Sequence, residues 1–198
     1  MPRPSRAVPL TALTLLAVLL SGCTSDPDPE AGPPSAPSSA SPSSSAPEPL
    51  RLETAVARVA GKLSQARRER VARKAGAVVE DYLQAAFLAG PPQGAFDSFT
   101  SGARKQARHD RRLLTAAGLR SAEPVTATHA AAYLSVLAPR GRVVGATARL
   151  EADLRVERRG EPRTVRLRGR LMLTPTAKGW RIFGYDLSRS VGARKGSK

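Results

Sequence analysis

Apolar residues recur at helical spacing in the segment that follows residue 50. Steps of three and four residues separate Leu52, Val56, Val59, Ala60 and Leu63. Before a stop at Gly90-Pro91-Pro92, the same stripe continues through Val71, Val78, Val79, Tyr82, Leu83 and Phe87. This period predicts an amphipathic helix, and because Gly61 and Gly76 weaken it, the pattern fits either one long helix or two.

A second helix is predicted from about Ala95 to Ala117. Its apolar face would consist of Phe96, Phe99, Ala103, Ala107, Leu113 and Leu114. Gly118 follows as a natural C-terminal stop.

The remainder of the chain alternates with a period of two, which predicts strands over residues 125–138, 147–157, 165–173 and 180–187. The two middle strands have an apolar face made of Ala148, Leu150, Ala152, Leu154, Val156, Val165, Leu167, Gly169, Leu171 and Leu173. Short turns join the strands, so neighbours are expected to be antiparallel. The expected fold is α+β, with N-terminal helices packed on a curled antiparallel sheet of about four strands.

The first 23 residues have the pattern of an export signal. Arg3 and Arg6 precede an apolar run, residues 7–20, which is too short for a stable membrane span. The following tetrapeptide, Leu20-Ser21-Gly22-Cys23, resembles the lipobox of bacterial lipoproteins, and Cys23 is the single cysteine of the chain. That resemblance implies removal of residues 1–22, diacylglyceryl attachment to Cys23 and anchoring in the cell membrane on its extracytoplasmic face. The alternatives are a plain secretory signal with a stray cysteine, or a cysteine buried in the core.

Composition divides the mature chain into parts. Residues 23–50 hold eight prolines and eight serines, which predicts a disordered tether. Residues 51–190 are the expected folded domain, and residues 191–198 an expected disordered basic tail. The whole chain carries 32 basic and 16 acidic residues, a net charge of +16. Residues 51–198 alone hold 30 basic and 12 acidic residues, an excess that requires either screening or an anionic partner.

Two clusters of basic residues stand out on the predicted helices. The first cluster is Arg67, Arg68, Arg70, Arg73 and Lys74, and the second is Arg104, Lys105, Arg108, Arg111 and Arg112. We interpret both as sites for an anionic lipid, a wall polymer or an acidic envelope protein. The alternative is a solvated basic face. Nucleic acid is excluded as a partner because the signal exports the chain and no aromatic platform accompanies the arginines.

A third set of arginines lies on the predicted sheet. In a hairpin around Gly160, Arg166, Arg168 and Arg170 approach the acids Glu151, Asp153 and Glu157 across the strands. We interpret this set as structural.

The sequence offers little catalytic chemistry. It contains no phosphate-binding glycine loop, and its two histidines, His109 and His129, have no metal-ligand spacing. No cofactor and no metal are expected. The strongest enzymatic hypothesis joins His129 to Asp153 or Tyr133 and requires them to face a cavity. Asp110 is expected to pair with arginines of its own helix.

Two segments carry a resemblance to a known fold family. They are Gly179 to Asp186, which reads Gly-Trp-Arg-Ile-Phe-Gly-Tyr-Asp, and Phe96 to Thr100 with the following Ala103, Asp110 and Leu113 to Thr115. Over residues 51–190 the order of elements resembles the nuclear transport factor 2-like fold, and more narrowly the actinobacterial envelope proteins associated with mammalian-cell-entry transporters. The resemblance implies a cone that is either packed or hollow, and relatives that are enzymes use an Asp or His inside it.

These observations favour a membrane-tethered, non-catalytic binding or adaptor lipoprotein. The alternative is a carrier of a small apolar ligand in the cone, with a cavity lined by Val125, Tyr133, Leu150, Leu154, Leu167, Leu171 and Trp180. An enzyme built on His129 ranks third.

Overall fold

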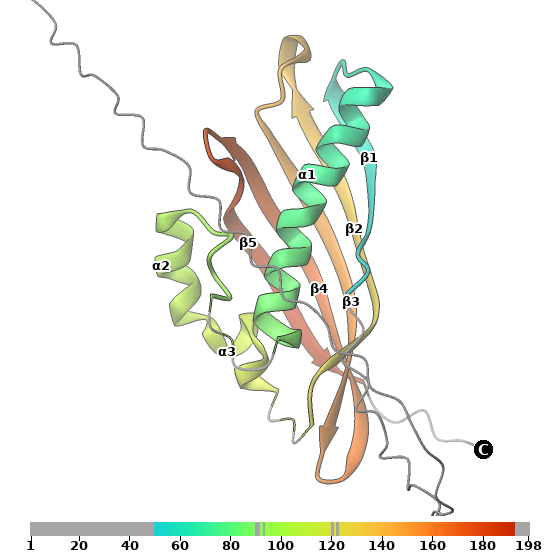
Figure 1. Cartoon of the computed structure of the whole chain (residues 1–198), viewed down its shortest axis with the longest axis vertical. Helices are drawn as coiled ribbons and strands as arrows, with labels where there is room; N and C mark the ends of the chain where they lie inside the picture. The colour runs from blue at the N-terminus through green and yellow to red at the C-terminus, as the bar shows by residue number, and fades with distance from the viewer. Residues whose placement is uncertain (1–49, 90–91, 93, 120, 122, 193–198) are drawn as a thin grey trace, which may run out of the picture. The chain divides into compact units, whose positions relative to one another are not determined.

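The computed structural model describes residues 50–89, 92, 94–119, 121 and 123–192. The predicted signal, Cys23 and the tether up to residue 49 lie outside this part, as do residues 193–198 of the predicted tail. Within it, the protein is an α+β fold in which helices pack on a five-stranded sheet (Figure 1).

The sheet follows the order of the chain from one edge to the other. Its strands are β1 (Glu53–Gly61), β2 (Thr126–Ala138), β3 (Gly145–Arg158), β4 (Glu161–Thr176) and β5 (Gly179–Val191). The pairs from β2 to β5 are antiparallel, as the short turns predict. β1 lies parallel to β2, because the chain returns to the same end of the sheet through the helices. The sheet is therefore mixed and has one strand more than expected.

The prediction of a helix over residues 52–63 is wrong, because this segment contains β1. A β-bulge between Val56 and Arg58 shifts the register, so Val56 pairs with Leu134 and Val59 with Val136. Both valines consequently lie on the helix-covered face, although they are three residues apart. The bulge therefore gives the inward valines of a strand the three-residue spacing that is typical of a helix. At the strand end Gly61 has φ +115°, and a Cβ there would lie 2.1 Å from the Ala138 carbonyl oxygen.

The helices occupy two stretches between β1 and β2. α1 (Gln65–Leu83) continues into a single π-helical turn, η1 (Gln84–Leu88). The predicted second helix is shorter than expected and broken into α2 (Ser101–His109), α3 (Arg111–Leu114) and the 3-10 turn η2 (Ala116–Gly118). A further 3-10 turn, η3 (Pro139–Gly141), joins β2 to β3.

The core lies between the helices and one face of the sheet. Alternation places Leu134, Leu150 and Leu167 on this inner face, where all three are fully buried. α1 lies so close to β1 that a Cβ at Gly76 would come within 2.6 Å of the Thr54 hydroxyl oxygen. The other face, which we call the open face, carries mainly charged and polar residues of β3 and β4. Among the described residues, no helix is both long enough and apolar enough to span a membrane.

Candidate functional site

The second basic cluster spans two helices: Arg104, Lys105 and Arg108 lie on α2, and Arg111 and Arg112 lie on α3. A short parallel bridge fixes the segment before α2 against β5. The Thr100 amide donates to the Ile182 carbonyl at 2.8 Å, and the Ile182 amide donates to the Ser98 carbonyl at 2.9 Å. The Thr100 hydroxyl then caps α2 by accepting from the Ala103 amide at 3.4 Å. Ala103 and Ala107 are buried beneath the helix. The small apolar side chains turn inward, so the arginines of the opposite face turn outward.

Three of these arginines line one surface groove. The groove has a volume of about 420 Å³ and is lined by Pro92, Gly94, Ala95, Phe96, Asp97, Arg104, Arg108 and Arg111. Its walls therefore combine three guanidinium groups with one carboxylate and an apolar floor. We call this the arginine groove.

Asp97 only partly neutralises the arginine groove. Its carboxylate lies 3.7 Å from Arg104 and its side chain is 76% exposed, so water screens the pair. Its backbone carbonyl accepts from Arg104 at 3.3 Å and from Arg181 at 2.8 Å. The Nε of Arg104 is buried without a partner. The guanidinium of Arg104 is thus held by one weak ion pair and one long hydrogen bond.

Arg108 and Arg111 are exposed and have no carboxylate partner among the described residues. Their forks of N–H donors match carboxylate and phosphate oxygens. The groove can therefore bind an anion without first breaking an internal ion pair of either residue. Lys105 and Arg112 are exposed as well but do not line the groove.

The first basic cluster has a different environment. Arg67, Arg68, Arg70, Arg73 and Lys74 are all exposed on the first half of α1. Two of them contact only backbone carbonyls: Arg67 donates to Gly141 at 3.1 Å, and Arg68 donates to Leu63 at 3.3 Å. The Gly141 contact places the start of α1 beside the turn between β2 and β3, whereas α2 lies along β5 (Figure 1). The two clusters therefore lie over opposite edges of the sheet and form two separate surfaces.

The arginines of the sheet are paired, but only in part as expected. Arg168 contacts Asp153 at 2.7 Å, as the structural interpretation predicts. Arg170 instead contacts Asp186 of β5 at 2.7 Å. Within the described residues Arg166 forms no ion pair, although it lies opposite Asp153 in the register.

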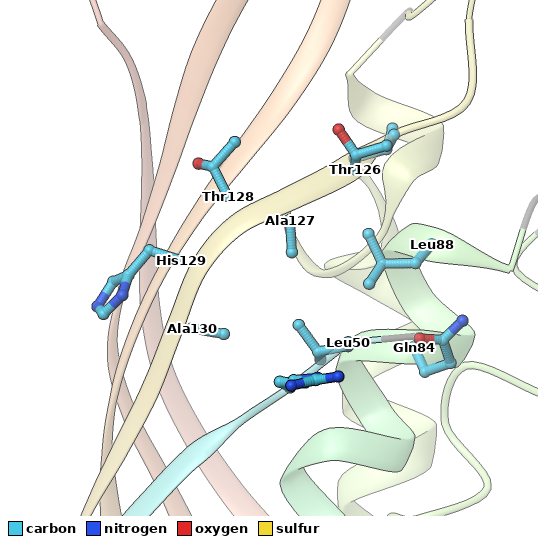
Figure 2. Close-up of a pocket in the computed structure, with 10 residues that line it drawn as sticks. Leu50, Gln84, Leu88, Thr126, Ala127, Thr128, His129 and Ala130 are labelled. Carbon is cyan, nitrogen blue, oxygen red and sulfur yellow. The ribbon is translucent and has the colours of Figure 1, made fainter. Parts of the chain in front are cut away.

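The enzymatic hypothesis fails on geometry. His129 is one of the residues that line an open pocket of about 360 Å³, but its imidazole points away from Leu50 and Leu88 of that pocket (Figure 2). It is exposed on the open face, where Asp153 is its neighbour and already contacts Arg168. These groups face solvent and do not share an enclosed cavity.

The predicted ligand cavity is also wrong. Leu150, Leu154, Leu167 and Leu171 are at most 2% exposed and belong to the continuous core beneath the helices. Trp180 and Val125 are part of the same core. Tyr133 lies on the opposite side of the sheet, where the Arg149 guanidinium stacks over its ring at 5.1 Å. The predicted lining residues therefore lie on two different faces of the sheet. Successive residues of a strand point to opposite faces, so Tyr133 points outward between the inward residues Ala132 and Leu134.

Sequence reasoning missed a polar network that holds α3 on the sheet. The Tyr185 hydroxyl donates to Asp110 at 2.7 Å, so Asp110 does not pair with its arginine neighbours as expected. Arg189 donates to the carbonyls of Thr115 and Gly118, both at 3.4 Å. Burial raises the pKa of Tyr185, as does the hydrogen bond to Asp110, and burial lowers the pKa of Arg189. These contacts link residues more than 70 positions apart and fix the segment that carries Arg111.

The described residues contain no group of three or more side chains suited to hold a metal ion. No protein-family model, curated protein or solved structure matches the chain.

Proposed function

We propose that the protein is a membrane-tethered extracytoplasmic lipoprotein whose domain is a non-catalytic binding module. In this proposal the arginine groove binds carboxylates of an acidic envelope protein, and Cys23 anchors the chain through its lipid. The relation to nuclear transport factor 2-like envelope proteins belongs to the same proposal and rests on the pattern of residues described above.

One observation carries the proposal: Arg108 and Arg111 line a single concave site and have no acidic partner among the described residues. A carboxylate entering the groove gains two bidentate partners and displaces only the weak contact between Arg104 and Asp97. The apolar floor at Phe96 suits the stem of an acidic side chain or a peptide segment better than a free ion. For this reason we favour an acidic protein over a wall polymer.

The groove is tested by charge reversal with a matched control. Arg108→Glu with Arg111→Glu reverses the two groove cations that have no carboxylate partner, and Arg70→Glu with Arg73→Glu makes the same charge change at the same spacing on α1. The measurement is the amount of partner protein that is cross-linked to this chain in intact cells. We expect the Arg108 and Arg111 variant to lower that amount at least about tenfold, because the reversed charges repel an acidic partner. The control pair should change that amount less than about threefold. Equal losses from the two pairs would mean that only net charge matters.

Anchoring is tested separately. Cys23→Ala removes the acylation site, so the protein should shift from the detergent phase to the aqueous phase or leave the cell envelope. The readout is detergent-phase partitioning together with the intact mass of the wild-type protein. Unchanged partitioning of the variant would contradict the lipoprotein part of the proposal.

A further inference from the structure

The end of the sheet that holds the β2–β3 and β4–β5 turns carries a cluster of exposed apolar side chains. Of the large hydrophobic residues in the described part of the chain, four are strongly exposed, and three of these line one hollow of about 510 Å³. These three are Leu137 at the end of β2, Val144 just before β3, and Phe183 in β5, which are 51%, 42% and 51% exposed. Scattered exposed apolar residues are ordinary, whereas exposed apolar residues gathered at one hollow are a candidate interaction surface. We call these residues the apolar tip.

A bulge in β5 and the turn after β2 explain why these side chains are exposed. A register shift at Met172 and Leu173 places Phe183 in a bulge of β5, since Leu173 pairs with Ile182 and Met172 with Gly184. The extra residue cannot join the inward alternation, so its ring stays exposed. On β2, Leu137 has the parity of the open face, and its carbonyl accepts from the Val144 amide at 3.0 Å. The turn therefore holds Leu137 and Val144 together.

The strand ends and turns around the apolar tip carry only cations. These exposed residues are Arg58 and Lys62 at the end of β1, Arg140 and Arg142 in the β2–β3 turn, and Lys178 in the β4–β5 turn. None of these five residues forms an ion pair within the described chain. Beside β5, the exposed carboxylate of Asp97 lies 3.7 Å from Arg104. The segments 54–63, 134–149 and 171–185 contain no Asp or Glu. The acids of the open face, such as Glu151 and Asp153, lie farther along β3 and are paired with Arg149 and Arg168.

This combination fits the surface of an anionic bilayer. Cations around exposed Leu, Val and Phe side chains let the apolar groups contact the acyl boundary while the cations remain among the head groups. An acidic protein would be recognised by ion pairs in a shaped site, as in the arginine groove, and would gain little from apolar groups at the end of β2, in the following turn and in β5.

Chain length allows the contact. The 26 residues from 24 to 49 separate Cys23 from the domain, and a chain of that length reaches at most about 90 Å. The sheet's longest strand has 16 residues, which corresponds to about 53 Å at the rise of a strand. An anchored domain can therefore bring either end of its sheet to the membrane.

We propose that the apolar tip is a membrane-docking surface that inserts Leu137, Val144 and Phe183 among anionic phospholipids. The proposal rests on the anchoring part of the proposed function and assigns a second role, orientation of the domain, to a surface that shares no lining residue with the arginine groove.

Photocrosslinking in nanodiscs tests this proposal on the full-length protein. The exposed residue Val144 is replaced by p-benzoylphenylalanine, and the same replacement at Ser190, exposed at the opposite end of the open face, serves as control. Discs contain either phosphatidylcholine alone or a mixture with phosphatidylglycerol. We expect lipid adducts at position 144 to be at least about tenfold more abundant in anionic discs, and rare at position 190. Arg140→Glu with Arg142→Glu should remove most of them, whereas Arg155→Glu with Arg166→Glu should not.

Each alternative outcome overturns the proposal. Adducts at position 144 that are absent, equal in both disc types or equal to those at position 190 would show that the tip does not dock on anionic lipid. Adducts to a second copy of the chain would assign the tip to self-association. Incorporation into the disc and the intact mass report anchoring, so a failure of anchoring is distinguishable from a failure of docking.

Discussion

The two basic clusters have similar composition and spacing but different surroundings. On α1 the cations extend into solvent, and two of them contact only the carbonyls of Gly141 and Leu63. In the second cluster Arg104, Arg108 and Arg111 line a groove together with Pro92 and the residues from Gly94 to Asp97. A convex cationic surface attracts anions of every kind and is screened by salt. A concave cationic surface can contact an anion from more than one side. Selective binding is therefore expected of the groove arginines and not of the cluster on α1.

The groove depends on aromatic packing under its floor. Phe99 contacts the rings of Tyr82 and Phe96 edge to face, both with centroids 5.4 Å apart, and is 2% exposed. Phe99→Ala should therefore lower the free energy of unfolding by about 3–5 kcal/mol and loosen α2. Val71→Ala beneath the α1 cluster should cost about 1–2 kcal/mol. Urea unfolding measures both, and a loss below about 1 kcal/mol for Phe99→Ala would mean that α2 is not anchored in this way.

Alkaline pH should weaken the domain through its buried tyrosine. Tyr82 donates to the Leu114 carbonyl at 2.9 Å, and burial raises its pKa above the ordinary value of 10.0. The folded state therefore keeps the Tyr82 proton when the unfolded chain has lost it. The stabilisation is complete below pH 10 and declines as the pH rises further, with a slope of about 1.4 kcal/mol per pH unit. Unfolding at pH 9 and pH 11 should show a smaller decline for Tyr82→Phe than for the wild type, and parallel declines would contradict the assignment.

Replacing two helix glycines by alanine should change the free energy of unfolding in opposite directions. At Gly76 of α1 a Cβ would lie 2.6 Å from the Thr54 hydroxyl oxygen and 3.1 Å from the Thr54 Cβ, so rotation of Thr54 gives no relief. Gly76→Ala should cost about 1–3 kcal/mol. At Gly102 of α2 a Cβ would meet nothing within 4 Å, so Gly102→Ala should stabilise by about 0.5–1 kcal/mol. Thermal or urea unfolding decides the signs, and two losses of similar size would show that α2 is packed as tightly as α1.

Much of the sheet could be predicted from sequence, because its alternation is local. The segments of β2 to β5 and the inward set from Ala148 to Leu173 follow from a period of two. β1 could not be recognised, since the bulge at Ala57 gives its valines helical spacing. Its parallel pairing with β2 depends on a return through the helices, which no local pattern encodes.

Less of the candidate site could be predicted. The exposed face of Arg104, Arg108 and Arg111 follows from helical geometry, but the groove also needs Phe96 and Asp97 of the preceding turn. The hydrogen bond between Asp110 and Tyr185 joins residues 75 positions apart. Such contacts depend on packing between elements, so a cluster of charges in the sequence could not distinguish a groove from a solvated face.

Quantitative cross-linking in intact cells tests whether the arginine groove binds one acidic envelope protein selectively. Lys105 lies exposed on α2 and Lys74 on α1, so each reports on the surroundings of one basic cluster. We expect wild-type cells to give recurrent cross-links from Lys105 to one acidic envelope protein. These links should fall at least about tenfold in Arg108→Glu with Arg111→Glu, while links from Lys74 stay diffuse and unchanged. Equal cross-linking of Lys74 and Lys105 to the same partners, or persistence of the Lys105 links in that variant, would contradict a specific role for the arginine groove.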